Sequence, residues 1–172
     1  MRYFVNVIVN RGYNKLIEEE DFIVHNTAQE PLVNPPANLE IGIEGKLRLS
    51  FELERTKFYL EDCIIGRLVF NLIKIKIANA EILLIKREQF GSGQNAVVEN
   101  KTVSKFEILD GTPTEGEEVN IRFHLSSTDL TPTYPNINNR FSCRYFLSLS
   151  ILDEDERRYL KQIEVELWRS KV

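Results

Sequence analysis

The chain has 172 residues, of which 42% are hydrophobic and 28% are charged, and its formal net charge is -4. This length and composition are typical of one folded domain, or of one domain with part of another, and they exclude a disordered chain. The basic residues are scattered along the acidic chain, which argues against a nucleic-acid-binding surface and against direct adsorption to an anionic membrane.

The first part of the chain differs from the rest. Residues 3–9 and 21–25 have the composition of strands, and an acidic run separates them. Pro31, Pro35 and Pro36 then indicate a linker. Because two strands alone do not form a stable sheet, we expect them to pack onto the following domain, to pair with another chain, or to be the remains of a further domain.

Regular alternation of apolar and polar residues begins at residues 46–54, where every second residue is apolar. A strand places successive side chains on opposite faces, so this segment has one face that is buried in the core and one that faces solvent. The same pattern occurs over residues 119–125, 141–151 and 163–167. These segments therefore predict antiparallel strands that cover a shared core.

The middle of the chain changes phase. The apolar residues before Leu72 alternate in one phase and those from Ile73 onward in the other, which predicts a bulge or a break between them. Two successive strands are expected through residues 80–85. Glycine, proline and acidic residues at 91–93, 110–113, 131–136 and 153–156 predict turns and loops. Many short strands without a long helical period indicate an all-β sandwich.

Residue types that carry catalysis are sparse. His25 and His124 are the only histidines, and His124 falls on the polar face of its predicted strand. Cys63 and Cys143 lie among apolar residues without the spacing of a metal site, so we interpret them as thiols in a reducing compartment. The glycines at 91 and 93 lack the lysine and the helix of a phosphate loop. We therefore expect no enzymatic activity, no metal and no cofactor.

Seven short segments occur in the order and at the spacing of one protein family. They are IIGR at 64–67, IKRE at 85–88, KFEILDG at 105–111, LTPT at 130–133, FSCRYFL at 141–147, DERRYLKQ at 155–162 and LWR at 167–169. Each is weak alone, but the set is specific. The chain resembles the C-terminal lobe of the vacuolar protein sorting-associated protein 26 family, the arrestin-like subunit of retromer. The resemblance extends back through residues 3–4 and 23–25.

This resemblance implies a fold and a role. Family members have two arrestin-like, immunoglobulin-type β-sandwich lobes, so residues 1–36 correspond to the last strands of the N-terminal lobe with a linker, and residues 37–172 to the C-terminal lobe. The family is a non-catalytic adaptor that connects the helical-repeat subunit (vacuolar protein sorting-associated protein 35), sorting nexins and cytoplasmic tails of transmembrane cargo. We therefore expect a cytoplasmic protein, peripheral on endosomal membranes and held there by its partners, that acts in retrograde transport.

The resemblance also places a partner-binding loop. The family's second lobe contacts the helical-repeat subunit through two adjacent apolar residues, which are Ile108 and Leu109 here, followed by Asp110 and Gly111. Reasoning from the residues agrees, because neighbouring strand residues point to opposite faces, so one of the pair faces away from the core unless a partner covers it. The alternative is that both residues end a strand that is buried on both sides.

A cargo groove is implied at Ile41, just before Gly42, and at Leu160, just after the Arg-Arg-Tyr segment. The family usually has an aromatic residue at the second position, so leucine is a departure from the pattern. An extended cargo tail that adds to a sheet would gain main-chain hydrogen bonds, and apolar pockets would give selectivity.

Two other functions remain as alternatives. A different arrestin-like trafficking adaptor would need a ligase-binding Pro-Tyr motif or a phosphate-sensing basic cluster, and the sequence has neither. A β-sandwich enzyme or ligand-binding domain such as a lectin would need a concave polar site with paired acids, histidine or metal, and no strand face stands out in this way. The sequence therefore favours the retromer adaptor.

Overall fold

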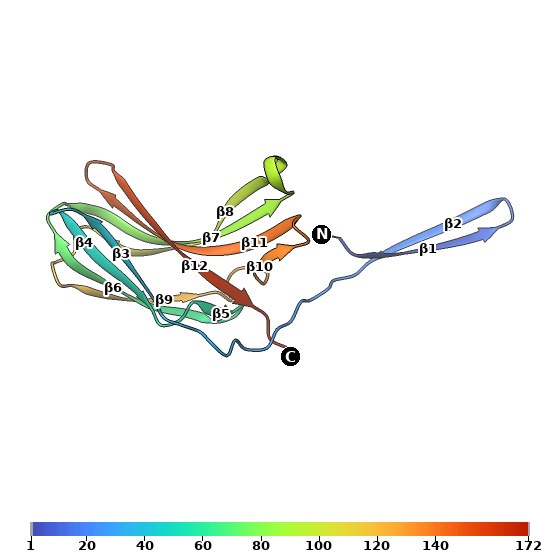
Figure 1. The fold of residues 1–172 in the computed structure, drawn as a ribbon, viewed down its shortest axis with the longest axis horizontal. Coiled ribbons are helices and arrows are strands. Elements are labelled where there is room, and N and C mark those ends of the chain that lie inside the picture. The colour runs from blue at the N-terminus through green and yellow to red at the C-terminus, as the bar shows by residue number, and fades with distance from the viewer. Residues whose placement is uncertain (1, 172) are drawn as a thin grey trace.

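The computed structural model describes residues 2–171, and almost all of its regular structure is strand (Figure 1). The elements are β1 (Phe4–Arg11), β2 (Asn14–Asp21), β3 (Ala37–Ile43), β4 (Leu47–Leu53), β5 (Lys57–Tyr59), β6 (Cys63–Ile73), β7 (Ile77–Phe90), the 3-10 turn η1 (Gly93–Asn95), β8 (Val97–Asp110), β9 (Glu118–His124), β10 (Tyr134–Ile137), β11 (Phe141–Asp153) and β12 (Arg158–Trp168).

Two stacked sheets form the body of the molecule (Figure 1). The first has the strand order β5-β12-β11-β7-β8, with β10 also paired to β11, and the second has the order β3-β4-β6-β9. Neighbouring strands are antiparallel except for β5, which runs parallel to β12. The predicted all-β sandwich is therefore confirmed.

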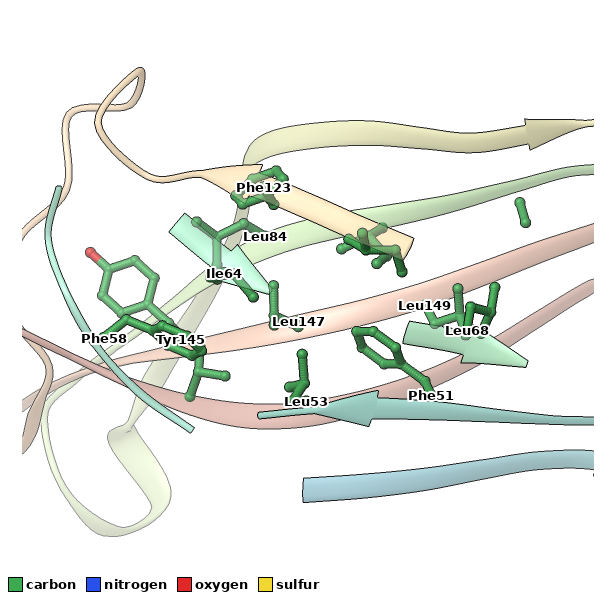
Figure 2. Packing of buried hydrophobic residues seen from close by; sticks show 14 of the residues in the cluster. Phe51, Leu53, Phe58, Ile64, Leu68, Leu84, Phe123, Tyr145, Leu147 and Leu149 are labelled. Atoms are coloured by element: carbon green, nitrogen blue, oxygen red, sulfur yellow. The ribbon is translucent and has the colours of Figure 1, made fainter. Parts of the chain in front are cut away.

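Alternate residues of the strands fill the space between the sheets. In β4 the apolar residues Leu47, Leu49, Phe51 and Leu53 are all buried, as the alternation predicts, while the residues between them lie toward solvent. Figure 2 shows side chains of β4, β6, β9 and β11 meeting in this core. Burial of each such side chain contributes about 1.5–3 kcal/mol, which accounts for a core that needs no disulfide.

The predicted change of phase is confirmed. Leu49 lies opposite Phe70 and Arg48 opposite Leu72, so Asn71 is the extra residue of a bulge, and β6 ends at Ile73. The expectation of two strands through residues 80–85 is wrong, because β7 is one strand of 14 residues between β11 and β8. Its central residues are covered on both faces, so the apolar run from Ile82 to Ile85 is not interrupted by polar residues.

The N-terminal strands form a hairpin that extends away from the sandwich (Figure 1). They pair in continuous register, and every residue of both strands is exposed. The expectation of a strand at 21–25 is wrong, because the turn at Gly12, with φ +56°, brings the chain back at once and the acidic run lies within β2.

The linker between the hairpin and β3 is fastened to the sandwich. The side chain of Asn34 accepts hydrogen bonds from the backbone N–H groups of Thr56 (3.0 Å) and Lys57 (2.9 Å) and donates one to the Lys57 carbonyl (2.7 Å). Farther back, the N–H of Ala28 donates to the carbonyl of Arg169 at 2.8 Å. The linker therefore fixes where β3 begins, although the hairpin itself stands free of the sandwich.

Candidate functional site

The apolar pair at the end of β8 lies at a β-bulge. Glu107 is opposite Glu81 and Leu109 is opposite Ala80, so Ile108 is the extra residue. Both apolar side chains pack against the core and both are half-buried. The expectation that one of the two must face away from the core is wrong here, because a bulge interrupts the alternation of side chains.

The turn that follows the bulge is tied to the start of β7. Gly111 has φ +96° and donates its N–H to the carbonyl of Ala78 at 2.8 Å. The hydroxyl of Thr112 accepts from the N–H of Ile77 at 2.8 Å and donates to the carbonyl of the same residue at 3.1 Å. Asp110, the last residue of β8, is exposed. The loop is therefore held in one shape, which lowers the conformational entropy that a partner must remove.

Charged groups lie beside the apolar pair. The ammonium of Lys105 is 2.6 Å from Oε1 of Glu81, a carboxylate on a residue only 5% exposed. The side-chain amide of Asn79 donates to the same oxygen at 3.3 Å. Phe106, on the same strand, is partly exposed and meets the ring of Phe123 edge-on across the two sheets. The edge of β8 thus presents half-buried apolar groups with charges around them.

The two expected cargo residues lie in different environments. Ile41 is on β3, opposite Leu49, and is 7% exposed within the core. Leu160 is on β12, opposite Ser150, and is 55% exposed on the outer face of the first sheet. The structure therefore does not bring the two side chains into one pocket.

The structure does bring their strands together. β3 is the outermost strand of the second sheet, and within the described residues β5 covers β12 only from Glu166 to Trp168. The rest of β12 therefore has an unpaired edge, and β3 and β12 lie in contact. Two free strand edges therefore lie next to each other. The prolines just before β3 are a sequence signal for an edge strand that could have indicated this arrangement.

A rigid turn positions Leu160. The carboxylate of Asp153 accepts hydrogen bonds from the N–H of Arg157 and the hydroxyl of Tyr159, both at 2.8 Å. Burial alone raises the pKa of Asp153, but these hydrogen bonds and the Arg157 charge outweigh it, so the pKa is lowered overall. The β11–β12 turn is therefore held most firmly when this carboxylate is ionised.

The two cysteines lie in different surroundings. His124 is exposed, and its Nε2 is 3.9 Å from the sulfur of Cys63 across β6 and β9. Cys143 is buried, and that burial raises the pKa of its thiol. Between residues 2 and 171, no group of three or more His, Cys, Asp and Glu side chains is placed to hold a metal ion. No helix in this part of the chain is long and apolar enough to cross a membrane.

Comparison with known proteins establishes the family of this chain. Residues 1–156 match the family model of vacuolar protein sorting-associated protein 26. The chain belongs to this family. The family resemblance seen in the sequence is thereby confirmed, and the fold is an arrestin-like β-sandwich.

Relatives from distant organisms agree. The chain is 45% identical over 169 residues to human vacuolar protein sorting-associated protein 26B, covering 98% of this chain and 50% of that protein. It is 45% identical over 173 residues to vacuolar protein sorting-associated protein 26 of Plasmodium falciparum (isolate 3D7), covering 100% and 58%. The match to the Dictyostelium discoideum protein is likewise 45%, over 173 residues, covering 100% and 50%. The chain therefore spans between half and three fifths of the length of these relatives.

Among solved structures, the fold is similar to that of Spo0M, a sporulation control protein from Bacillus subtilis. The TM-score is 0.55 at 14% sequence identity, and the match covers 72% of this chain and 50% of that one. At this low identity the similarity concerns the fold alone.

Proposed function

We propose that this chain acts as a non-catalytic adaptor of the retromer complex in endosomal retrograde protein sorting. The observation that carries the proposal is its 45% identity, over nearly its whole length, to proteins named for vacuolar protein sorting. As an adaptor it would join a helical-repeat subunit, sorting nexins and cargo tails at the cytoplasmic face of endosomes, with its partners holding it at the membrane.

The bulge at Ile108 and the turn that follows it, residues 108–112, form a loop that we call the bulge loop. Its shape supports a contact with the helical-repeat subunit. Ile108 and Leu109 keep part of their apolar surface open beside the exposed Asp110, on a loop whose backbone is already fixed. Full burial of a side chain of this size is worth about 1.5–3 kcal/mol, so covering the exposed part of both adds a useful fraction of that to binding. A groove between two helices of a solenoid is suited to receive such a short apolar pair.

The two open edges support a place for cargo tails. An extended tail can add a strand to β3 or to the uncovered part of β12, where main-chain groups are free to bond. Leu160 offers an exposed apolar side chain next to that edge. Ile41 contributes by fixing β3 on the core, so we assign it a positioning role in the groove and assign direct contact to Leu160.

The proposal is tested by isothermal titration calorimetry of the purified 172-residue chain with the helical-repeat retromer subunit. We expect saturable binding of one molecule to one. Absence of binding by a chain that retains β-type circular dichroism would contradict the proposal. A cargo tail titrated separately tests the open edges without involving the bulge loop.

A further inference from the structure

Glu81 is a buried carboxylate in the middle of the first sheet. Its neighbours Ala80 and Ile82 point into the core, so the side chain of Glu81 lies on the opposite face of β7. The residue is nevertheless only 5% exposed. Because an ionised carboxylate is costly to bury without partners, the groups around Glu81 have to compensate its charge.

The compensating charge comes from β8, the strand that carries the bulge. Nζ of Lys105 lies 2.6 Å from Oε1 of Glu81, and the side-chain amide of Asn79 donates to the same oxygen at 3.3 Å. Lys105 stands opposite Leu83 in the ladder, so the ion pair connects the two strands diagonally. The carboxylate therefore binds both its own strand and the neighbouring one.

The bulge lies between two connections of β8 to β7. The ion pair of Lys105 precedes the extra residue Ile108, and the hydrogen bond from the N–H of Gly111 to the carbonyl of Ala78, at 2.8 Å, follows it. Both connections end on the same short part of β7. The backbone of the residues between them is thus held from both sides.

A second carboxylate makes the lysine necessary. Glu107 stands directly opposite Glu81 in the ladder, and like charges at such positions destabilise a pair of strands. Lys105 compensates the buried charge, so the two strands can stay together at this point. Without Lys105, the buried carboxylate would lack its cation and would face Glu107 directly. The two strands would then separate at the residue before Ile108.

We infer that the ion pair between Glu81 and Lys105 positions the bulge loop for its partner. Glu81 acts through Lys105 and the backbone of β8, so it is a positioning residue and not a contact residue. The pair holds Ile108 and Leu109 in the geometry in which they meet the partner. The inference rests on the proposed function and names the residues that shape its contact site.

Calorimetric titration of the helical-repeat subunit tests the effect on binding. We expect Lys105→Met to weaken binding by about tenfold, a size typical of coupling within one ion-pair network. Adding Glu81→Gln to this variant should restore the affinity, because the buried group is then neutral. The matched control is Lys101→Met, which removes an exposed lysine of β8 opposite Lys86 and should bind as the wild type does.

Two binding results would overturn the inference. Unchanged affinity of Lys105→Met would show that the ion pair does not position the loop. Equally weak binding by Lys105→Met and by the double variant with Glu81→Gln would show that Lys105 acts by direct contact with the partner.

Amide hydrogen exchange of the free chain, followed by nuclear magnetic resonance, gives a readout that needs no partner. The amide of Gly111 should exchange faster in Lys105→Met than in the wild type and slowly again in the double variant. Equal exchange in all three chains overturns the inference. If the wild type does not bind the helical-repeat subunit, the proposed function fails, and the exchange of Gly111 still decides whether the ion pair positions the loop.

Circular dichroism separates a displaced loop from a lost fold. A Lys105→Met chain that unfolds while the double variant with Glu81→Gln folds supports the inference, because only the single variant has an uncompensated buried carboxylate. If neither variant folds, the ion pair maintains the whole sandwich, and its assignment to the bulge loop is overturned.

Discussion

Leu109 lies directly opposite Ala80 on the neighbouring strand, whereas Ile108, the residue before it, has no partner across the ladder. This bulge places two apolar side chains side by side at the end of an edge strand, both against the core and both partly open to solvent.

The double substitution Ile108→Asp with Leu109→Asn should weaken binding of the helical-repeat subunit by about 2 kcal/mol or more, as expected for the central apolar contacts of an interface. The reason is that both residues would then present polar groups to an apolar partner surface. Calorimetric titration measures the effect. Undiminished affinity would contradict the assignment of this loop.

The control for that experiment lies on the same strand. Val97→Asp with Val98→Asn makes the same kind of change at two exposed valines of β8, far along the strand from the bulge. It should leave affinity unchanged. Ile108 and Leu109 also touch the core, so their substitution affects stability as well as binding. Asp110→Lys changes an exposed side chain of the same loop, so its effect on binding is not accompanied by a loss of stability.

Gly66 should be essential for packing between β4 and β6. A Cβ at this position would lie 2.8 Å from the carbonyl oxygen of Glu52 and 3.1 Å from side-chain atoms of Phe51 and Leu53. Gly66→Ala should lower the free energy of unfolding by about 1–3 kcal/mol, the usual effect of overpacking a core. Denaturant unfolding measures it. In Gly42→Ala the nearest contact is 3.5 Å, so a loss as large in that control would count against the packing explanation.

Stability should fall in acid through Asp153. Its pKa is lowered in the folded state, so its contribution is present above the pKa of the unfolded chain and is lost as the pH falls through the folded value. Asp153→Asn should therefore be less stable than the wild type at neutral pH. In urea unfolding at a series of pH values, the difference should narrow toward acid, and a difference independent of pH would contradict this role.

Leu160 and Ile41 should respond differently to substitution. Ile41→Ala removes a core side chain and should cost about 2–5 kcal/mol of folding free energy. Leu160→Ala changes an exposed side chain and should alter stability by no more than about 0.5 kcal/mol. The same leucine variant should weaken binding of a cargo tail in fluorescence polarisation. Equal cargo binding by wild type and Leu160→Ala would remove Leu160 from the groove.

The strands with one wet face could be predicted from the sequence because each carries its pattern in its own residues. Leu47 to Leu53 alternate regularly and form β4, and the runs that became β9, β11 and β12 were found in the same way. The phase change before Ile73 also indicated its bulge, because a face can change only where the ladder is interrupted.

The geometry of the candidate site depends on how neighbouring strands pair. The sequence of a single strand does not encode this pairing. The bulge at Ile108 exists because β8 is matched against β7, and no residue within 105–111 marks it. The open edge beside Leu160 exists because β5 is short and covers only the end of β12. The family resemblance could name these positions, but the geometry that makes them accessible came from the structure.

The most direct test of the proposed partner contact is hydrogen–deuterium exchange of this chain with and without the helical-repeat subunit. We expect slower exchange at residues 108–112 in the complex and unchanged exchange at residues 97–101 of the same strand. Bound complex with unchanged exchange at 108–112 would contradict it.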